Sequence, residues 1–237
     1  METSSLEKDN LTFMQGVKDC IPTILGYMSI GIAAGVVGVS SNLSVFEVFL
    51  LSTFVYAGAS QFIICALLVA GSPIAFIFFT TFIVNLRHLL LSMTLAPNFS
   101  KYSLFNNVGI GALVTDESFG VATHQLALGK TINDRWMHGL NFTAYTCWIL
   151  SCVVGAIFGK WIANPEVFGL DFALTAMFIA LLVLQLDTLK KSKLKLYLSL
   201  ILYVIVLMVL LCTIFPSYIA VIISTVIVAT IGVLKDK

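Results

Sequence analysis

The chain has 237 residues, of which 59% are hydrophobic and only 11% charged, whereas a typical soluble domain is about 45–50% apolar and about 25% charged. The 13 basic and 12 acidic residues leave a net charge of +1, which provides no field to attract nucleic acid and, together with the high hydrophobicity, excludes intrinsic disorder. This composition predicts an all-α polytopic membrane protein embedded in a lipid bilayer.

The amino-terminal region predicts a first membrane span that is retained. Glu2, Glu7 and Asp9 give residues 1–10 the wrong charge for the basic start of a secretory signal. A short cytoplasmic segment over residues 1–19 is expected to precede the span. No connection further along is long enough for a soluble domain, so residues 1–237 are expected to form one integral membrane transporter domain.

Two long runs without charged residues, 48–86 and 196–234, are each expected to cross the membrane twice. As a helix, each run would be about 58 Å long, roughly twice the thickness of the hydrocarbon core. Turns are therefore expected at residues 71–73 (Gly-Ser-Pro) and 215–217 (Phe-Pro-Ser). In all, the pattern predicts about eight transmembrane helices, at about 20–40, 48–70, 74–96, 104–128, 136–162, 168–187, 194–214 and 217–234. The number falls to seven if residues 104–128 do not cross fully.

The basic residues predict the orientation of these helices, because lysine and arginine accumulate on the cytoplasmic side of a membrane. With the amino terminus inside, ten basic residues lie in cytoplasmic segments, Lys101 and Lys160 lie on the other side, and Arg87 lies within a span. The ten are Lys8, Lys18, Lys130, Arg135, Lys190, Lys191, Lys193, Lys195, Lys235 and Lys237. Both termini are therefore expected to be cytoplasmic.

The first and fifth segments each carry a Gly-x-x-x-Gly motif, Gly31 with Gly35 and Gly155 with Gly159. Small residues let helix backbones approach each other closely in lipid. We expect both motifs to pack against another helix, either within the chain or in a partner subunit.

The cysteines are expected to be small buried hydrophobic residues. They lie in apolar stretches and form no Cys-x-x-Cys pair, at Cys20, Cys65, Cys147, Cys152 and Cys212. No metal site and no cofactor are expected.

Residues 56–61 (Tyr-Ala-Gly-Ala-Ser-Gln) form a small, polar interruption in the otherwise aliphatic second segment. Local unwinding there would expose backbone carbonyl groups together with Gly58, Ser60 and Gln61 to a ligand, as in the discontinuous helices of transporters. The Gly-x-Ser sequence leaves an alternative, an intramembrane serine protease with His88 as its base. Rhomboid-like proteases carry glycine after the serine, whereas Gln61 follows Ser60, so we favour a binding site and expect no enzyme.

Three ionisable residues fall near the centres of predicted spans: Arg87 in 74–96, and Asp116 and Glu117 in 104–128. Each costs about 2.5–3.5 kcal/mol at the membrane midplane, so these side chains must face protein, water or one another. Consecutive helical residues point about 100° apart. One carboxylate can therefore face Arg87 while the other is left without a countercharge.

Two interpretations of these charges stay open. Either the ion pair only fixes the register of two helices, or the cluster is a transport site. In a transport site a proton, a cation or a substrate ammonium group balances the free carboxylate, and the neighbouring His88 titrates near neutral pH. The candidate substrate-binding residues are Gly58, Ser60, Gln61, Asn85, Arg87, Asp116 and Glu117, and the candidate proton-coupling residues are Asp116, Glu117 and His88.

Several polar stretches, taken in chain order, resemble the AzlC family, the large subunit of two-component branched-chain amino-acid exporters. The motifs are A-G-A-S-Q, N-x-R-H and T-D-E-S-F, within resembling segments at 16–35, 51–63, 82–97, 113–122 and 170–186. The resemblance implies export of leucine, isoleucine, valine or their analogues across a bacterial plasma (inner) membrane, driven by an ion or proton gradient. It also implies a small AzlD-like membrane subunit as partner.

Residues and resemblance together predict an exporter subunit with a midplane site between segments 48–70, 74–96 and 104–128. Arg87 suits the carboxylate of a zwitterionic hydrophobic amino acid, and either neighbouring acid suits its ammonium group. A passive channel and a non-transporting scaffold are the alternatives, although the sequence lacks the repeated filter motif or charged ring of a channel.

Overall fold

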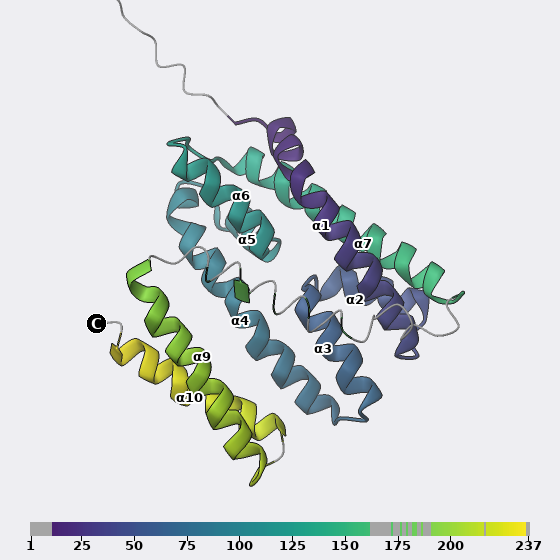
Figure 1. Ribbon diagram of the computed structural model, residues 1–237. Coiled ribbons are helices and arrows are strands. Elements are labelled where there is room, and N and C mark those ends of the chain that lie inside the picture. The colour runs from purple at the N-terminus through teal and green to yellow at the C-terminus, as the bar shows by residue number, and fades with distance from the viewer. Residues whose placement is uncertain are drawn as a thin grey trace, which may run out of the picture. The chain divides into compact units, whose positions relative to one another are not determined.

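The computed structural model is helical wherever it describes regular structure, which confirms the predicted all-α class (Figure 1). It describes residues 11–161, isolated positions between 172 and 186, and residues 191–215 and 217–235. The chain divides into two compact units, Met1–Ala176 and Met177–Lys237.

The helices of the two units follow one another in chain order. The first unit contains α1 (Phe13–Ser40), α2 (Val45–Phe54), α3 (Gly58–Val69), α4 (Ile74–Phe99), α5 (Leu104–Ala112), α6 (Asp116–Ala127) and α7 (Asp134–Gly159). The second contains α9 (Lys191–Cys212) and α10 (Ser217–Lys235). The predicted span over 168–187 lies mostly outside the described residues.

Four of the described helices are long and apolar enough to cross a membrane: α1, α4, α7 and, within α9, Ser192–Cys212. Their large apolar side chains are widely exposed, as on α4, where Ile74 and Phe78 are 83% and 74% accessible. Contiguous apolar surface of this kind is typical of a protein that faces lipid. The chain is therefore an integral membrane protein with several spans.

The second and fourth predicted spans are each made of two short helices. A break within 48–70 agrees with the unwinding expected there, whereas the break within 104–128 was not expected. Residues 55–57 separate α2 from α3, and residues 113–115 separate α5 from α6. With 10 and 9 residues, α2 and α5 are each about 15 Å long, half of the hydrocarbon thickness.

The first helix begins at Phe13 rather than near residue 20, because Thr12 caps its start. The Thr12 hydroxyl oxygen accepts a hydrogen bond from the backbone N–H three residues later, at 3.2 Å. The earlier start brings Asp19 into α1, where one carboxylate oxygen accepts hydrogen bonds from Trp136 of α7 at 2.9 Å and from Gln125 of α6 at 3.0 Å. These contacts join three helices near the beginning of α1.

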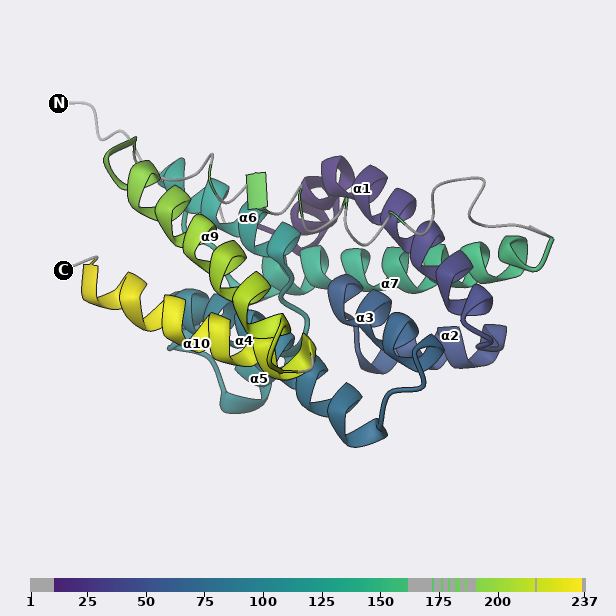
Figure 2. The same ribbon diagram turned by 60° about the horizontal axis from the view of Figure 1, so that its bottom comes forward.

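α1 runs alongside α7, and glycine determines how closely the two backbones approach (Figures 1 and 2). A Cβ atom added at Gly35 would lie 2.0 Å from the carbonyl oxygen of Cys152, and one added at Gly155 would lie 2.1 Å from that of Ile32. Real Cβ atoms do not come so close to another atom, so only glycine fits. The close packing predicted for the two Gly-x-x-x-Gly motifs is confirmed, and it occurs within the chain.

The same backbone contact recurs towards the other end of the pair. A Cβ atom at Gly16 would lie 2.0 Å from the carbonyl oxygen of Trp136, and one at Gly139 would lie 2.1 Å from that of Phe13. Backbone contact therefore extends along most of both helices.

In the second unit, α9 packs against α10. α9 ends at Cys212 and α10 begins at Ser217, so the chain leaves the helix in the region where a turn was expected, although residue 216 of that turn lies outside the described residues. A Cβ atom at Gly232 would lie 3.1 Å from Leu200, so this glycine again permits a close approach.

Candidate functional site

The middle of α4 contacts the beginnings of both helices that follow a break. The Ser60 hydroxyl, in the first turn of α3, donates a hydrogen bond to the side-chain oxygen of Asn85 at 2.6 Å. Two residues further along α4, Arg87 forms an ion pair with Asp116, in the first turn of α6, with 3.0 Å between Nη2 and Oδ2. Four of the predicted site residues therefore meet at α4.

The two neighbouring carboxylates face different partners, as their helical spacing predicted. While Asp116 pairs with Arg87, the Glu117 carboxylate accepts a hydrogen bond from the hydroxyl of Tyr27 on α1 at 3.1 Å. Among the described residues, Glu117 has no cationic partner. The cluster of one arginine and two acids thus carries an uncompensated negative charge.

The second break ends where Thr115 caps α6. Its hydroxyl oxygen accepts a hydrogen bond from the backbone N–H of Ser118, and the Ser118 side chain reaches back to the backbone N–H of Thr115. Acidic residues in the first turn that follows are favoured by the positive end of the helix dipole. The Tyr27 hydroxyl also hydrogen-bonds to Thr115, so α1 contacts the cap as well as Glu117.

α7 donates hydrogen bonds to carbonyl groups at the other side of both breaks. The last carbonyl groups of a helix have no partner within it. Tyr145 donates a hydrogen bond to the carbonyl oxygen of Thr53 near the end of α2 at 2.9 Å, and Asn141, one turn earlier, donates to that of Ile110 near the end of α5 at 3.1 Å. Both interrupted segments are therefore held between α4 and α7.

The first break places a tyrosine in an unusual backbone conformation. Tyr56 has a φ of +40°, in the left-handed region that costs a residue other than glycine of the order of 1–3 kcal/mol. Its ring packs edge-on against that of Tyr145, with 4.8 Å between centroids. Its hydroxyl is buried and lies near the Tyr27 side chain. The unwinding expected over 56–61 is present, but it covers residues 55–57 instead.

The remaining predicted residues lie around this break and on α4. Gly58 begins α3, and Gln61 is only 4% exposed, with no hydrogen-bond partner for its amide nitrogen in the described regions. His88 is half-buried and directly follows Arg87 in α4. Because the Ser60 hydroxyl donates to Asn85, the described geometry does not form the Ser60–His88 pair that a serine protease requires.

Sequence reasoning missed four residues that shape this site: Tyr27, Thr115, Asn141 and Tyr145. A threonine followed by two acids is a recognisable helix start, so the second break had a signal in the sequence. The hydrogen bonds of Tyr27, Asn141 and Tyr145 join residues far apart in the chain, and no local pattern predicts them.

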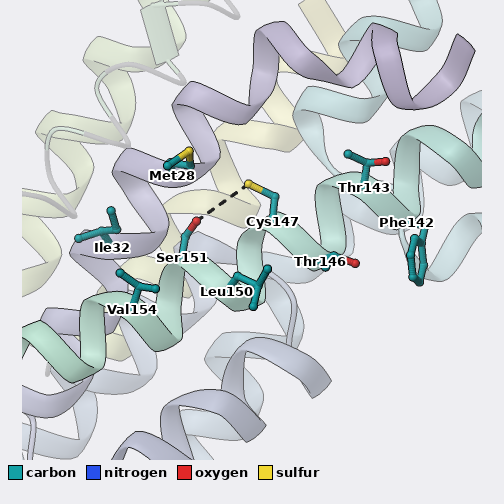
Figure 3. Close-up of a pocket in the computed structure, with 9 residues that line it drawn as sticks. All are labelled: Met28, Ile32, Phe142, Thr143, Thr146, Cys147, Leu150, Ser151 and Val154. Atoms are coloured by element: carbon teal, nitrogen blue, oxygen red, sulfur yellow. Dashed lines mark hydrogen bonds between the residues drawn. The ribbon is translucent and has the colours of Figure 1, made fainter. Parts of the chain in front are cut away.

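An apolar groove of about 490 Å³ lies between α1 and α7, apart from the charged cluster (Figure 3). Met28 and Ile32 of α1 line it, together with α7 residues from Phe142 to Val154. None of the predicted site residues belongs to it. We therefore place the candidate site at the two breaks and not in this groove.

Comparisons with known proteins connect this geometry to a family. A family model described as AzlC protein matches residues 22–162, a range that includes both breaks and every predicted site residue. The inner membrane protein YgaZ of Escherichia coli K12 is 32% identical over 177 residues, which are 73% of this chain and 72% of that protein. The branched-chain amino acid transport protein AzlC of Bacillus subtilis 168 is 27% identical over 170 residues, or 70% of this chain and 64% of that protein.

A relative from Archaeoglobus fulgidus, described as an uncharacterized membrane protein, is 29% identical over 182 residues, or 76% of this chain and 78% of that protein. No solved structure matches the chain.

Proposed function

The chain belongs to the AzlC family, and from this membership and the two broken helices we propose that it exports branched-chain amino acids. The substrates are leucine, isoleucine, valine or their analogues, and the protein acts in a bacterial plasma membrane with a small AzlD-like subunit. A relative named for branched-chain amino acid transport supports the substrate class.

The proposed topology has eight transmembrane helices with both termini in the cytoplasm, and each broken pair, α2 with α3 and α5 with α6, counts as one span. The excess of basic residues on one side supports the orientation. Helices interrupted near the membrane midplane are the usual location of binding sites in secondary transporters.

The observation that carries the proposal is the free carboxylate of Glu117 beside the Arg87–Asp116 ion pair. An uncompensated charge inside a membrane is costly, and either a substrate ammonium group or a proton can balance it. We assign Glu117 to the ammonium group, and Glu117, Asp116 and His88 to proton coupling. The Tyr27 hydroxyl orients Glu117 for this role.

Transport into inside-out membrane vesicles tests the proposal, because export then becomes uptake. With the full chain and its small partner, labelled leucine should accumulate when a proton gradient is imposed, and accumulation should stop when the gradient is collapsed. Glu117→Gln should abolish accumulation, since it removes the charge that binds the ammonium group and the proton. Glu47→Gln is the matched control, because Glu47 is exposed at the start of α2 and lies outside the cluster.

Two results would contradict the proposal. Equilibration of leucine without accumulation would identify a passive channel. Accumulation by Glu117→Gln at the rate of Glu47→Gln, with unchanged dependence on pH, would remove Glu117 from the mechanism.

A further inference from the structure

The ion pair between Arg87 and Asp116 leaves the carboxylate of an amino-acid substrate in need of another partner. We propose that this carboxylate binds at the open amino-terminal end of α3, against its free backbone N–H groups and the side-chain amide of Gln61. The inference rests on the proposed function, and it replaces Arg87 as the partner of the substrate carboxylate.

The beginning of α3 is both uncapped and buried. Its N-cap residue is Ala57, which offers no side-chain hydrogen bond. Five other described helices of this unit begin with a side chain that accepts a hydrogen bond from the first turn, from Thr12, Ser44, Ser103, Thr115 and Asn133. Around the start of α3, Ala57, Ala59 and Ser60 are 4%, 1% and 0% exposed, and Gly58 is partly exposed, so most of this turn is shielded from solvent.

The two breaks differ in charge. Unpaired N–H groups and the helix dipole make a helix start attractive to anions. At α6 the chain supplies its own anions, Asp116 and Glu117, in the first turn. The first turn of α3 contains no acidic residue, so an external carboxylate can bind there.

Gln61 gives independent evidence for a ligand at this helix start. Gln61 is only 4% exposed, and its amide nitrogen has no hydrogen-bond partner among the residues that the structure describes. Because helical side chains lean towards the amino-terminal end of their helix, we expect the Gln61 amide nitrogen to face the open first turn. Its amide oxygen is already contacted by the Cys152 thiol at 3.8 Å, which leaves the amide N–H groups to face a ligand.

Tyr56 connects this site to the second break. Its hydroxyl is buried and lies near the side chains of Tyr27 and Glu117. The carboxylate end of a zwitterion would therefore lie at the first break and its ammonium end towards the second.

Binding measurements with two probes test the assignment on the full chain purified together with its small partner subunit. The probes are leucine and 3-methylbutylamine, which is leucine without its carboxylate. Gln61→Met removes the amide donor at nearly constant volume, and Ala57→Ser supplies a hydroxyl that caps the open turn. Each variant should raise the Kd for leucine about tenfold or more and leave that for the amine within about twofold. Ala66→Ser, at an exposed position of the same helix, should change neither Kd.

The outcomes separate this inference from the proposed function. If the wild-type protein binds leucine and both variants bind it equally well, or if they lose leucine and the amine in parallel, the carboxylate site is wrong while amino-acid binding stands. If the wild-type protein binds neither probe, the proposed function itself fails. Ala57→Ser adds a single oxygen and a helix cap, so it decides the question even if Gln61→Met does not fold.

Discussion

Glu117 and Asp116 are neighbours in the chain, but their surroundings give them different tasks. Asp116 lies 3.0 Å from Arg87 and is therefore neutralised as part of a pair. Glu117 is held only by the Tyr27 hydroxyl among the described groups, which stabilises its position without cancelling its charge. This difference suits Glu117 to binding the substrate ammonium group in the proposed mechanism, whereas Asp116 combines its proposed part in proton coupling with the ion pair to Arg87.

Arg87→Gln alone should lower the amount of folded protein, because it leaves Asp116 without its counterion. We expect a loss of roughly 2 kcal/mol, less than the 3–5 kcal/mol typical of a fully buried pair, since the two side chains are 26% and 25% exposed. Adding Asp116→Asn should restore folding, measured as the monodisperse fraction after extraction. Export should remain impaired, because the pair holds the first turn of α6, and with it Glu117, against α4.

The double variant also separates the two interpretations of the cluster. If Arg87→Gln with Asp116→Asn exported leucine at the wild-type rate and with the same pH profile, the ion pair would serve only to fix helix register.

At the scale of the helices, α4 and α7 stabilise the two breaks from opposite sides of the interruption, α4 at the helix beginnings and α7 at the helix ends. α4 contacts the two helix beginnings through Asn85 and Arg87, and α7 binds the carbonyl groups at the two helix ends through Asn141 and Tyr145. A carbonyl group left without a hydrogen bond costs several kcal/mol in the hydrocarbon core of a membrane. In a protein interior the cost is about 1–3 kcal/mol. By donating hydrogen bonds to these carbonyl groups, Asn141 and Tyr145 lower the free-energy cost of interrupting the helices within the bilayer.

Gly35→Ala should disrupt the packing of α1 on α7, because the new methyl group would lie 2.0 Å from a backbone oxygen that cannot move independently. Overpacking of this kind costs about 1–3 kcal/mol, which we expect as a lower midpoint of thermal unfolding in detergent. Gly26→Ala is the matched control in the same helix, since a Cβ atom there meets nothing within 4 Å. Equal midpoints for the two variants would contradict the backbone contact.

The sequence predicted those features of the helices that depend on local pattern. The glycine motifs predicted close packing, and residues 56–61 predicted unwinding to within a few positions. The second break was missed because hydropathy averages over residues 113–115, although Thr115 and the acids after it form a helix start. The hydrogen bond from Tyr145 to the carbonyl oxygen of Thr53 could not be predicted from a local pattern, because the two residues are 92 positions apart in the chain.

For the whole molecule, the distribution of basic residues predicts that both termini lie in the cytoplasm. Reporter fusions after residues 132 and 237 should both give a cytoplasmic signal. A fusion after residue 101, next to one of the two basic residues assigned to the other side, should give the opposite signal. Opposite signals from residues 132 and 237 would contradict an even number of spans between them.

The site as a whole was predictable as a set of residues but not as an arrangement. Polar residues in apolar segments stand out by composition, and Ser60, Asn85, Arg87 and Asp116 do meet. Their pairing follows from where two helix beginnings contact α4, which depends on tertiary packing. The sequence predicted that one acid could face Arg87, and the structure identifies that acid as Asp116; the ligand-binding role of Arg87 stays a prediction.

The glycine contacts between α1 and α7 also limit how the protein can move. Side chains that interdigitate can slip past one another by changing rotamers, whereas two backbones in direct contact have no such freedom. From Gly16 and Gly139 at one end to Gly35 and Gly155 at the other, the pair should therefore behave as a rigid body. The proposed exporter would have to open its site to each side of the membrane in turn. We expect the interrupted helices and α4 to make this movement, while α1 and α7 stay fixed relative to each other.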